Sequence, residues 1–169
     1  MSPHDQPAAG REPATTYNLL FVCTGNTCRS PLAAAVARAA VARRGWRHVA
    51  VQSAGLSALT GSPAAENAVR VAGEHGLDLT GHEAQPLTPE LVAWADLVLG
   101  MGPSHLIGIA DMGGGEKAAL VTDFLDGPGL GRPIDDPIGG DTETYRRTLA
   151  QVSEAVEGIL RRLEPIVAP

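Results

Sequence analysis

The sequence predicts one α/β domain built on a parallel sheet, and three observations support this fold class. Short apolar runs alternate along the chain with longer segments that have the apolar periodicity of helices. The 169 residues, of which 44% are hydrophobic and 19% charged, are enough to bury the core of one domain. No internal repeat and no break in composition divides the chain, so we expect a single unit.

The predicted elements follow one another from the first apolar run to the C-terminus. We expect strands at 17–22, 49–52, 96–101 and 118–121. We expect helices at 31–44, 64–74, 102–110 and 142–163, and a short one that starts at Pro89 after a Thr88 cap. Turns are expected at 53–55 and 113–115, with a loop at 126–141. In the last helix the apolar residues recur every three or four positions, which is typical of one buried helix face.

Charge and composition exclude several classes of function. The net charge is −6 and no basic block exceeds a pair such as Arg43-Arg44, so we expect no nucleic-acid partner. No apolar run reaches the length of a membrane span. Residues 1–16 lack the apolar centre of a signal peptide, and we expect a disordered leader and a cytoplasmic, monomeric protein with reduced cysteines. The histidines show no metal-ligand spacing, and we expect neither a metal nor a cofactor.

The stretch "VCTGNTCRSP" at 22–31 carries the chemistry. It lies between the first strand and the first helix, where ligands bind in open α/β sheets. The start of a helix and a curl of small residues both favour an anion, and the planar fork of Arg29 matches phosphate oxygens. Cys23 would lie at the floor of this loop, where positive surroundings favour its thiolate. The stretch therefore predicts a phosphate-binding loop with a nucleophile.

The same stretch resembles the signature of the low-molecular-weight protein tyrosine phosphatase family, which is close to V-C-x-G-N-x-C-R-S-P. Further landmarks of the family follow in order: "SAG" at 53–55, "HG" at 75–76, "ADLVLGM" at 95–101 and "DP" at 136–137. The resemblance implies a catalytic domain at 17–165 with a four-stranded parallel sheet flanked by helices on both faces. It points to the bacterial members, and "CTGNTCRSP" is similar to their protein arginine phosphatase branch.

The resemblance also implies roles for the loop residues. Cys23 would attack phosphorus and form a phosphocysteine, while Ser30 would hydrogen-bond its sulfur. Arg29 and the loop amides would hold the phosphate oxygens. These amides belong to Thr24, Gly25, Asn26, Thr27, Cys28 and Arg29. Cys28 is either structural or, as in the family, able to trap an oxidised Cys23 as a reversible disulfide.

Residues outside the loop complete the predicted site. Asp136 would be the general acid and then the general base, preferred over Asp135 because Asp136 precedes proline. Asn26 would brace the loop through Ser53 and His75, although His75 could equally be an ordinary helix-end residue.

Three residues bear on the substrate. Thr27 is typical of the arginine phosphatase branch, and a hydroxyl suits a guanidinium better than an apolar ring does. Leu59 and Ile138 stand where tyrosine-specific members usually place aromatics, so neither wall offers a ring to a phenol. Ile138 also departs from the arginine branch, which often has phenylalanine there.

We therefore expect a phosphoprotein phosphatase acting on phosphoarginine, slightly ahead of phosphotyrosine. The alternatives are a strictly phosphotyrosine-specific phosphatase, a phosphatase of small metabolites, an arsenate reductase and a non-catalytic phosphate-binding module. No cysteine follows Cys28, which leaves only an external-thiol version of the reductase. A binding module would not need the acid Asp136.

Overall fold

The four predicted strands form one sheet in which every strand is parallel to its neighbours. The structure is a computed structural model that describes residues 16–167. Its strands are β1 (Tyr17–Cys23), β2 (Val49–Gly55), β3 (Leu97–Gly100) and β4 (Ala118–Leu120). Their order across the sheet is β2-β1-β3-β4. The predicted fold class is confirmed, whereas the predicted leader, apart from its last residue, lies outside the described residues.

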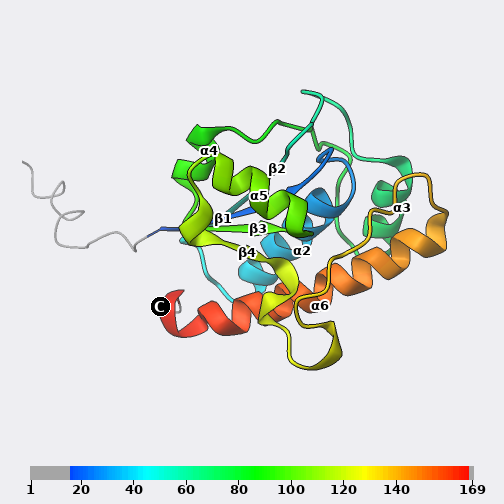
Figure 1. The fold of residues 1–169 in the computed structure, drawn as a ribbon. Coiled ribbons are helices and arrows are strands. Elements are labelled where there is room, and N and C mark those ends of the chain that lie inside the picture. Colours follow the sequence, from blue (N-terminus) through cyan, green and yellow to red (C-terminus); the bar gives the residue numbers. More distant parts are fainter. Residues whose placement is uncertain (1–15, 168–169) are drawn as a thin grey trace, which may run out of the picture.

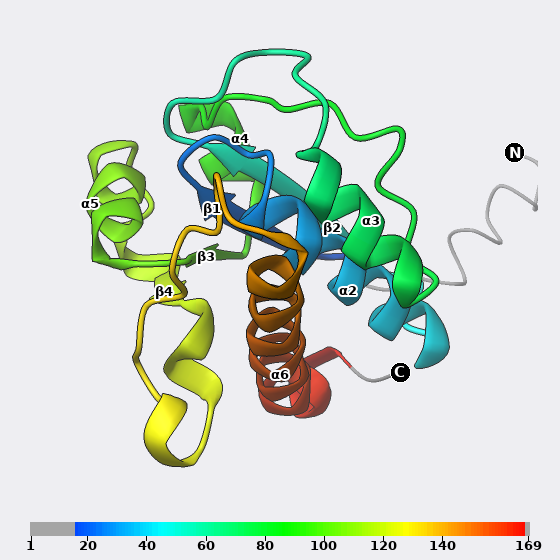
Figure 2. The same ribbon diagram turned by 90° about the vertical axis from the view of Figure 1, so that its right-hand side faces the viewer.

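Helices cover both faces of the sheet. They are α2 (Arg29–Arg43), α3 (Glu66–Glu74), α4 (Pro89–Trp94), α5 (Pro103–Asp111) and α6 (Thr142–Val167). Short 3-10 turns occur at η1 (Gly115–Lys117), η2 (Val121–Phe124) and η3 (Gly127–Gly129). Figures 1 and 2 show α2 and α6 on one face and α4 and α5 on the other, with α3 packed beside α6. Within the described residues, none of these helices is long and apolar enough to cross a membrane.

The alternation of side chains along β1 divides the core between the two faces. Leu19, Phe21 and Cys23 belong to the cluster shared with α2 and α6. Leu20 and Val22 belong to the cluster under α4 and α5. Successive strand residues point to opposite faces, and a sheet covered on both faces needs this uninterrupted apolar run.

The last helix confirms its predicted buried face and extends beyond its predicted end. The six predicted apolar positions are all buried: Tyr145, Leu149, Val152, Val156, Ile159 and Leu163. The helix continues through Pro165 to Val167, because Val167 is itself buried against the main core cluster.

The second strand is longer than predicted. Residues 53–55 were expected to form a turn, but they continue β2 by pairing with the last residues of β1. Gly55 pairs with Cys23, and an added Cβ at Gly55 would lie 2.5 Å from the carbonyl oxygen of Thr24. The small side chains that suggested a turn instead allow the strand to lie directly beneath the loop that follows β1.

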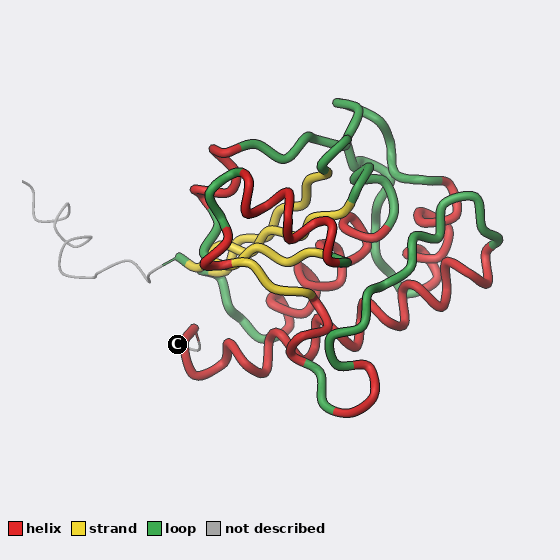
Figure 3. The backbone as a smooth tube through the Cα atoms, in the orientation of Figure 1, coloured by secondary structure: helices red, strands yellow, loops and turns green. Residues whose placement is uncertain are grey.

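The strand order places a binding crevice at the carboxyl end of β1. From β1 the chain moves to β2 on one side, and β3 lies on the other side of β1. Ligands bind where the connections diverge in this way. Figure 3 shows loops gathered at the ends of the strands opposite to the start of the described chain. The loops after β1 and β3 meet there.

Candidate active site

The loop after β1 is shaped by Asn26, its one residue with a left-handed backbone (φ 56°). Asparagine tolerates this conformation better than most residues. Its side chain is fully buried, and its Nδ2 donates to Ser30 Oγ (2.8 Å) and Ser53 Oγ (2.9 Å). Its Oδ1 accepts from the backbone N–H of Gln85 (2.9 Å). These three bonds fix the centre of the loop, and the expected contact with Ser53 is present.

The histidine that supports Asn26 is His82 and not His75. His82 Nε2 donates to the carbonyl oxygen of Asn26 at 2.7 Å. His75 lies exposed where α3 ends and lines a separate hollow of about 650 Å³ with residues of α2 and α6, such as Val36 and Leu149. The expectation for His75 was wrong because the chain turns away after α3 and returns to the loop only at 82–85.

Cys23 lies at the floor of the loop, 2% exposed, with its Sγ 2.9 Å from Ser30 Oγ. Ser30 Oγ already accepts from Asn26, so its own hydrogen is available to the sulfur, with the carbonyl oxygen of Ala54 (3.4 Å) as a second acceptor. A hydroxyl that donates to sulfur stabilises the thiolate.

Arg29 presents one edge of its guanidinium to the loop. The side chain is 8% exposed, and Nη1 donates to the carbonyl oxygen of Ile134 at 2.9 Å. Nη2 lies 3.5 Å from Asp136 Oδ2, and Nε is buried without a partner among the described residues. A buried unpaired donor is costly. Nε and Nη2 lie on the same edge of the fork, so they can receive two oxygens of one phosphate group.

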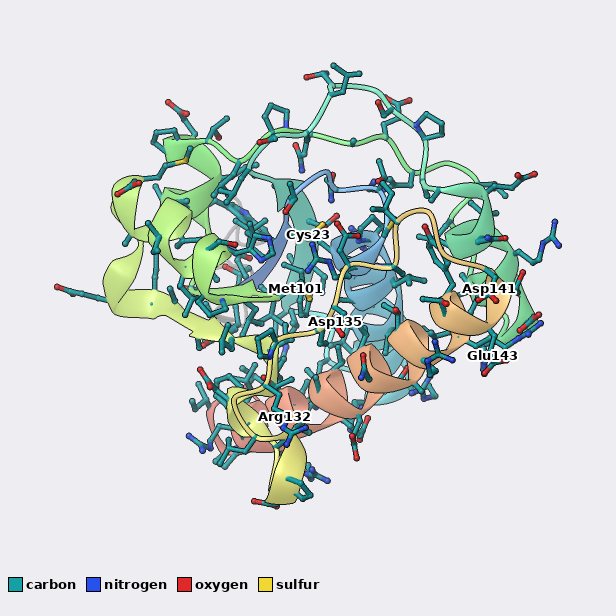
Figure 4. The ribbon with its side chains drawn as sticks, turned by 45° about the vertical axis from the view of Figure 1, so that its right-hand side comes forward. Cys23, Met101, Arg132, Asp135, Asp141 and Glu143 are labelled. Carbon is teal, nitrogen blue, oxygen red and sulfur yellow. The ribbon has the colours of Figure 1, made fainter. Side chains whose placement is uncertain are left out.

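The two adjacent aspartates point to different places. Asp136 approaches Arg29, is 43% exposed, and accepts the backbone N–H of Ile138 through Oδ1 at 3.1 Å. Asp135 instead lines a hollow of about 470 Å³ beside η2 and α6. In Figure 4 the segment between Arg132 and Asp141 rises past Asp135, which lies below Cys23 in this view, and then runs beside Cys23. Pro137 is buried and anchors this segment.

His105 is a site residue that the sequence reasoning missed. It lies in the first turn of α5 and is 2% exposed. Its Nδ1 accepts from the N–H groups of Met101 (3.2 Å) and Gly102 (3.1 Å), and its Nε2 lies 3.0 Å from Thr24 Oγ1. Burial and the nearby Arg29 cation lower the pKa of His105 to about 4, against the opposing effect of Asp136. The sequence carried no signal for this role beyond a histidine near a helix start.

Cys28 packs against the last helix. Its Sγ lies 3.3 Å from the Tyr145 hydroxyl, which comes from α6, and 3.7 Å from Thr27 Oγ1. Burial raises the pKa of the Cys28 thiol, and the nearby Asp136 and Cys23 add to this increase. Both cysteines are free thiols here. The disulfide that the family resemblance implies therefore stays a prediction.

The three residues that bear on the substrate differ in exposure. Leu59 is 76% exposed and Ile138 is 66% exposed, whereas Thr27 in the loop is half-buried. Within residues 16–167, no group of three or more His, Cys, Asp or Glu side chains is arranged to hold a metal ion.

A buried cysteine under a strand-to-helix loop, an arginine with a free edge and a nearby carboxylate are the features that the sequence predicts for a phosphatase site. The comparison with known families agrees. The family model described as low molecular weight phosphotyrosine protein phosphatase matches residues 18–167. The chain belongs to this family, and it is an enzyme of the low-molecular-weight protein tyrosine/arginine phosphatase type.

Curated relatives include both kinds of phosphatase. A probable low molecular weight protein-tyrosine-phosphatase, EpsP, of Ralstonia solanacearum is 36% identical over 148 residues, covering 88% of this chain and 97% of its own. A protein-arginine-phosphatase of Bacillus subtilis is 35% identical over 147 residues, covering 87% and 97%.

Solved structures show the same fold. A YwlE mutant from Bacillus subtilis matches with a TM-score of 0.81 and 33% identity, covering 88% of this chain and 99% of its own. A YwlE arginine phosphatase, in which serine replaces a cysteine and the active-site serine is phosphorylated, has a TM-score of 0.82 and 34% identity, covering 88% and 97%.

Proposed function

We propose that this protein is a phosphoprotein phosphatase that hydrolyses phosphoarginine or phosphotyrosine through a phosphocysteine intermediate. The observation that carries the proposal is the geometry around Arg29. Its Nε is buried and unpartnered among the described residues, and its Nη2 faces Asp136. A phosphate group in the loop would satisfy the free edge of Arg29 and lie above the Cys23 sulfur.

The first chemical step is transfer of the phosphoryl group to Cys23. The thiolate attacks phosphorus in line, so a sulfur–phosphorus bond forms as the bond to the leaving oxygen or nitrogen breaks. Arg29 and the loop amides hold the equatorial oxygens as charge moves. Asp136, partly exposed at the mouth, gives its proton to the leaving atom.

The second step releases phosphate. Asp136, now a carboxylate, takes a proton from a water that attacks the phosphocysteine, and the sulfur leaves as a thiolate. The Ser30 hydroxyl at 2.9 Å from Cys23 Sγ stabilises that thiolate in both steps. The phosphorylated active-site serine of the related arginine phosphatase structure supports a covalent phosphoryl intermediate for this chemistry.

Phosphoarginine ranks slightly ahead of phosphotyrosine as the substrate. Leu59 and Ile138 are exposed and aliphatic, so neither wall offers a ring to stack on a phenol. The half-buried Thr27 adds a hydroxyl at the loop, which suits a guanidinium. Relatives of both specificities are about equally similar, so the walls and Thr27 carry the preference.

The test is phosphate release from two peptides that differ only in phosphoarginine or phosphotyrosine, with Cys23→Ser as the blank. We expect faster release from phosphoarginine, no turnover by Cys23→Ser, and retained vanadate binding by that variant. A faster reaction with phosphotyrosine would favour the strictly tyrosine-specific alternative. Turnover by Cys23→Ser would remove Cys23 as the nucleophile.

A companion variant, Thr27→Ile, tests the source of the preference. We expect the ratio of phosphoarginine to phosphotyrosine hydrolysis to fall, because the variant replaces a hydroxyl with an apolar group. An unchanged ratio would show that Thr27 does not set specificity.

A further inference from the structure

The two ends of the phosphate loop are joined by a ring of hydrogen bonds that passes outside the loop. At its start, Thr24 Oγ1 lies 3.0 Å from His105 Nε2. His105 in turn accepts the N–H groups of Met101 and Gly102, in the turn between β3 and α5. His105 therefore connects the loop after β1 with the turn after β3, across the point where the sheet connections diverge.

The ring closes through the segment that carries the acid. The carbonyl oxygen of Met101 accepts the N–H of Ile134 at 2.9 Å. The carbonyl oxygen of Ile134 accepts Arg29 Nη1 at 2.9 Å, and Arg29 begins α2 directly after the loop. Figure 4 shows Met101 between Cys23 and the segment that bears Asp135. Thr24, His105, Met101, Ile134 and Arg29 thus form a closed circuit around the cysteine.

The direction of each bond follows from the donors. The two backbone amides can only donate, so Nδ1 of His105 is an acceptor and carries no hydrogen. In a neutral ring the hydrogen is then on Nε2, which donates it to Thr24 Oγ1. The buried setting keeps the ring neutral. His105 thus has one tautomer, and both of its nitrogens are used.

The packing around His105 is adapted to hold it in place. An added Cβ on Gly100, the last residue of β3, would lie 2.9 Å from the Cβ of His105. Thr24 is held from its other side, because its carbonyl oxygen accepts the N–H of Ser57 at 2.9 Å. The loop start is therefore fixed between the segment after β2 and His105.

We propose that His105 is a positioning residue for phosphoryl transfer: by bonding Thr24 and the Met101–Gly102 turn, it sets Arg29 and the Asp136 segment relative to Cys23. This inference rests on the proposed function. His105 reaches no substrate atom itself, and it acts through the ring. Loss of the bond between His105 and Thr24 leaves the loop folded but frees the acid-bearing segment to shift against the nucleophile.

The test compares His105→Asn, Thr24→Val and the double variant. Asparagine keeps an oxygen near the Nδ1 position to accept the two amides but cannot reach Thr24, while valine keeps the shape of threonine without its hydroxyl. We expect each single variant to lower kcat/KM for p-nitrophenyl phosphate by about 3- to 10-fold, the scale of one hydrogen bond. The double variant should lose no more than a single one, because both remove the same bond.

Two further variants separate positioning from general damage. Thr24→Ser restores a hydroxyl and should recover most of the loss seen with valine. His48→Asn, at the opposite end of the sheet, is the matched histidine control and should keep the wild-type kcat. Vanadate affinity, measured by calorimetry, should weaken in parallel with kcat/KM in the two ring variants.

The outcomes distinguish this inference from the proposed function. If His105→Asn and Thr24→Val both keep the wild-type kcat/KM and vanadate affinity, the inference about His105 is wrong. The proposed phosphatase function would not be affected by that result. Multiplied losses in the double variant would also overturn it, since the two side chains would then act separately. A wild-type protein that hydrolyses neither phosphoarginine nor phosphotyrosine would contradict the proposed function, and the vanadate measurements would still decide the role of His105.

Discussion

At the scale of single residues, the adjacent Asp135 and Asp136 lie in different surroundings. Asp136 faces Arg29 at 3.5 Å and is held by the N–H of Ile138, whereas Asp135 lines a separate hollow. The sequence favoured Asp136 over Asp135 as the general acid because Asp136 precedes a proline. The geometry favours the same residue for an independent reason, since proximity to Arg29 places its carboxyl at the mouth of the loop.

We expect Asp136→Ala to slow hydrolysis of substrates with poor leaving groups by about 10²–10⁴-fold, the usual contribution of a general acid. Substrates with good leaving groups should lose less, because they need little protonation. Asp135→Ala is the matched control, and steady-state kinetics on both classes of substrate make the comparison. A larger loss in Asp135→Ala would show that Asp135, and not Asp136, is the general acid.

A second residue-scale prediction concerns the support of Asn26. His82→Ala removes the donor to the carbonyl oxygen of Asn26, so we expect kcat/KM to fall about 3- to 10-fold and stability to fall by about 1 kcal/mol. His75→Ala should stay within about 0.5 kcal/mol of wild type, because His75 is exposed where α3 ends. Urea unfolding and p-nitrophenyl phosphate kinetics on both variants test this. Equal losses of kcat/KM and stability in His82→Ala and His75→Ala would mean that His75 also supports Asn26.

At the scale of elements, β2 shows how the phosphate loop depends on the strand beneath it. The end of β2 pairs with the end of β1, and the N–H of Leu56 donates to the carbonyl oxygen of Cys23 at 3.0 Å. Gly55 lies so close to the loop that a Cβ would contact the backbone of Thr24 at 2.5 Å and of Asn26 at 2.8 Å. The sequence suggested a turn at 53–55 because small residues favour turns, and only the tertiary pairing makes them a strand.

Gly55→Ala should therefore damage the loop. We expect a loss of about 1–3 kcal/mol in the free energy of unfolding, typical of overpacking, together with weaker vanadate binding. Gly73→Ala is the matched control, because Gly73 lies within α3 with open space around its Cβ position. That change should stabilise the protein by about 0.5–1 kcal/mol. Vanadate affinity unchanged in Gly55→Ala would show that the close approach does not shape the loop.

At the scale of the whole molecule, the parts that could be predicted are those that the chain encodes locally. The loop between β1 and α2, the buried stripe of α6 and the alternation of strands and helices are contiguous patterns, and all are present in the fold. The ring through His105 joins residues 81 positions apart in the chain. It follows from the strand order, which brings the turn after β3 beside the loop after β1. No local pattern distinguishes such a histidine from an ordinary helix-start residue.

The same buried histidine should make global stability depend on pH. Burial, and secondarily the Arg29 cation, lower the pKa of His105 to about 4, although Asp136 opposes this, while a histidine in the unfolded chain has a pKa of about 6.5. Above pH 6.5 both states are neutral and the contribution to stability is complete. As the pH falls below 6.5 the unfolded state takes up the proton first, so stability is lost down to about pH 4.

Between pH 7.5 and 5 this loss amounts to about 2 kcal/mol for the wild type. His105→Asn has no titrating group at this position, while the acidic side chains and other histidines titrate in both proteins and cancel in the difference. Urea unfolding across this range should therefore show the free-energy gap between wild type and His105→Asn narrowing as the pH falls. A gap that stays constant with pH would mean that His105 takes up its proton at the same pH in the folded and the unfolded protein, which would contradict a lowered pKa for the buried ring.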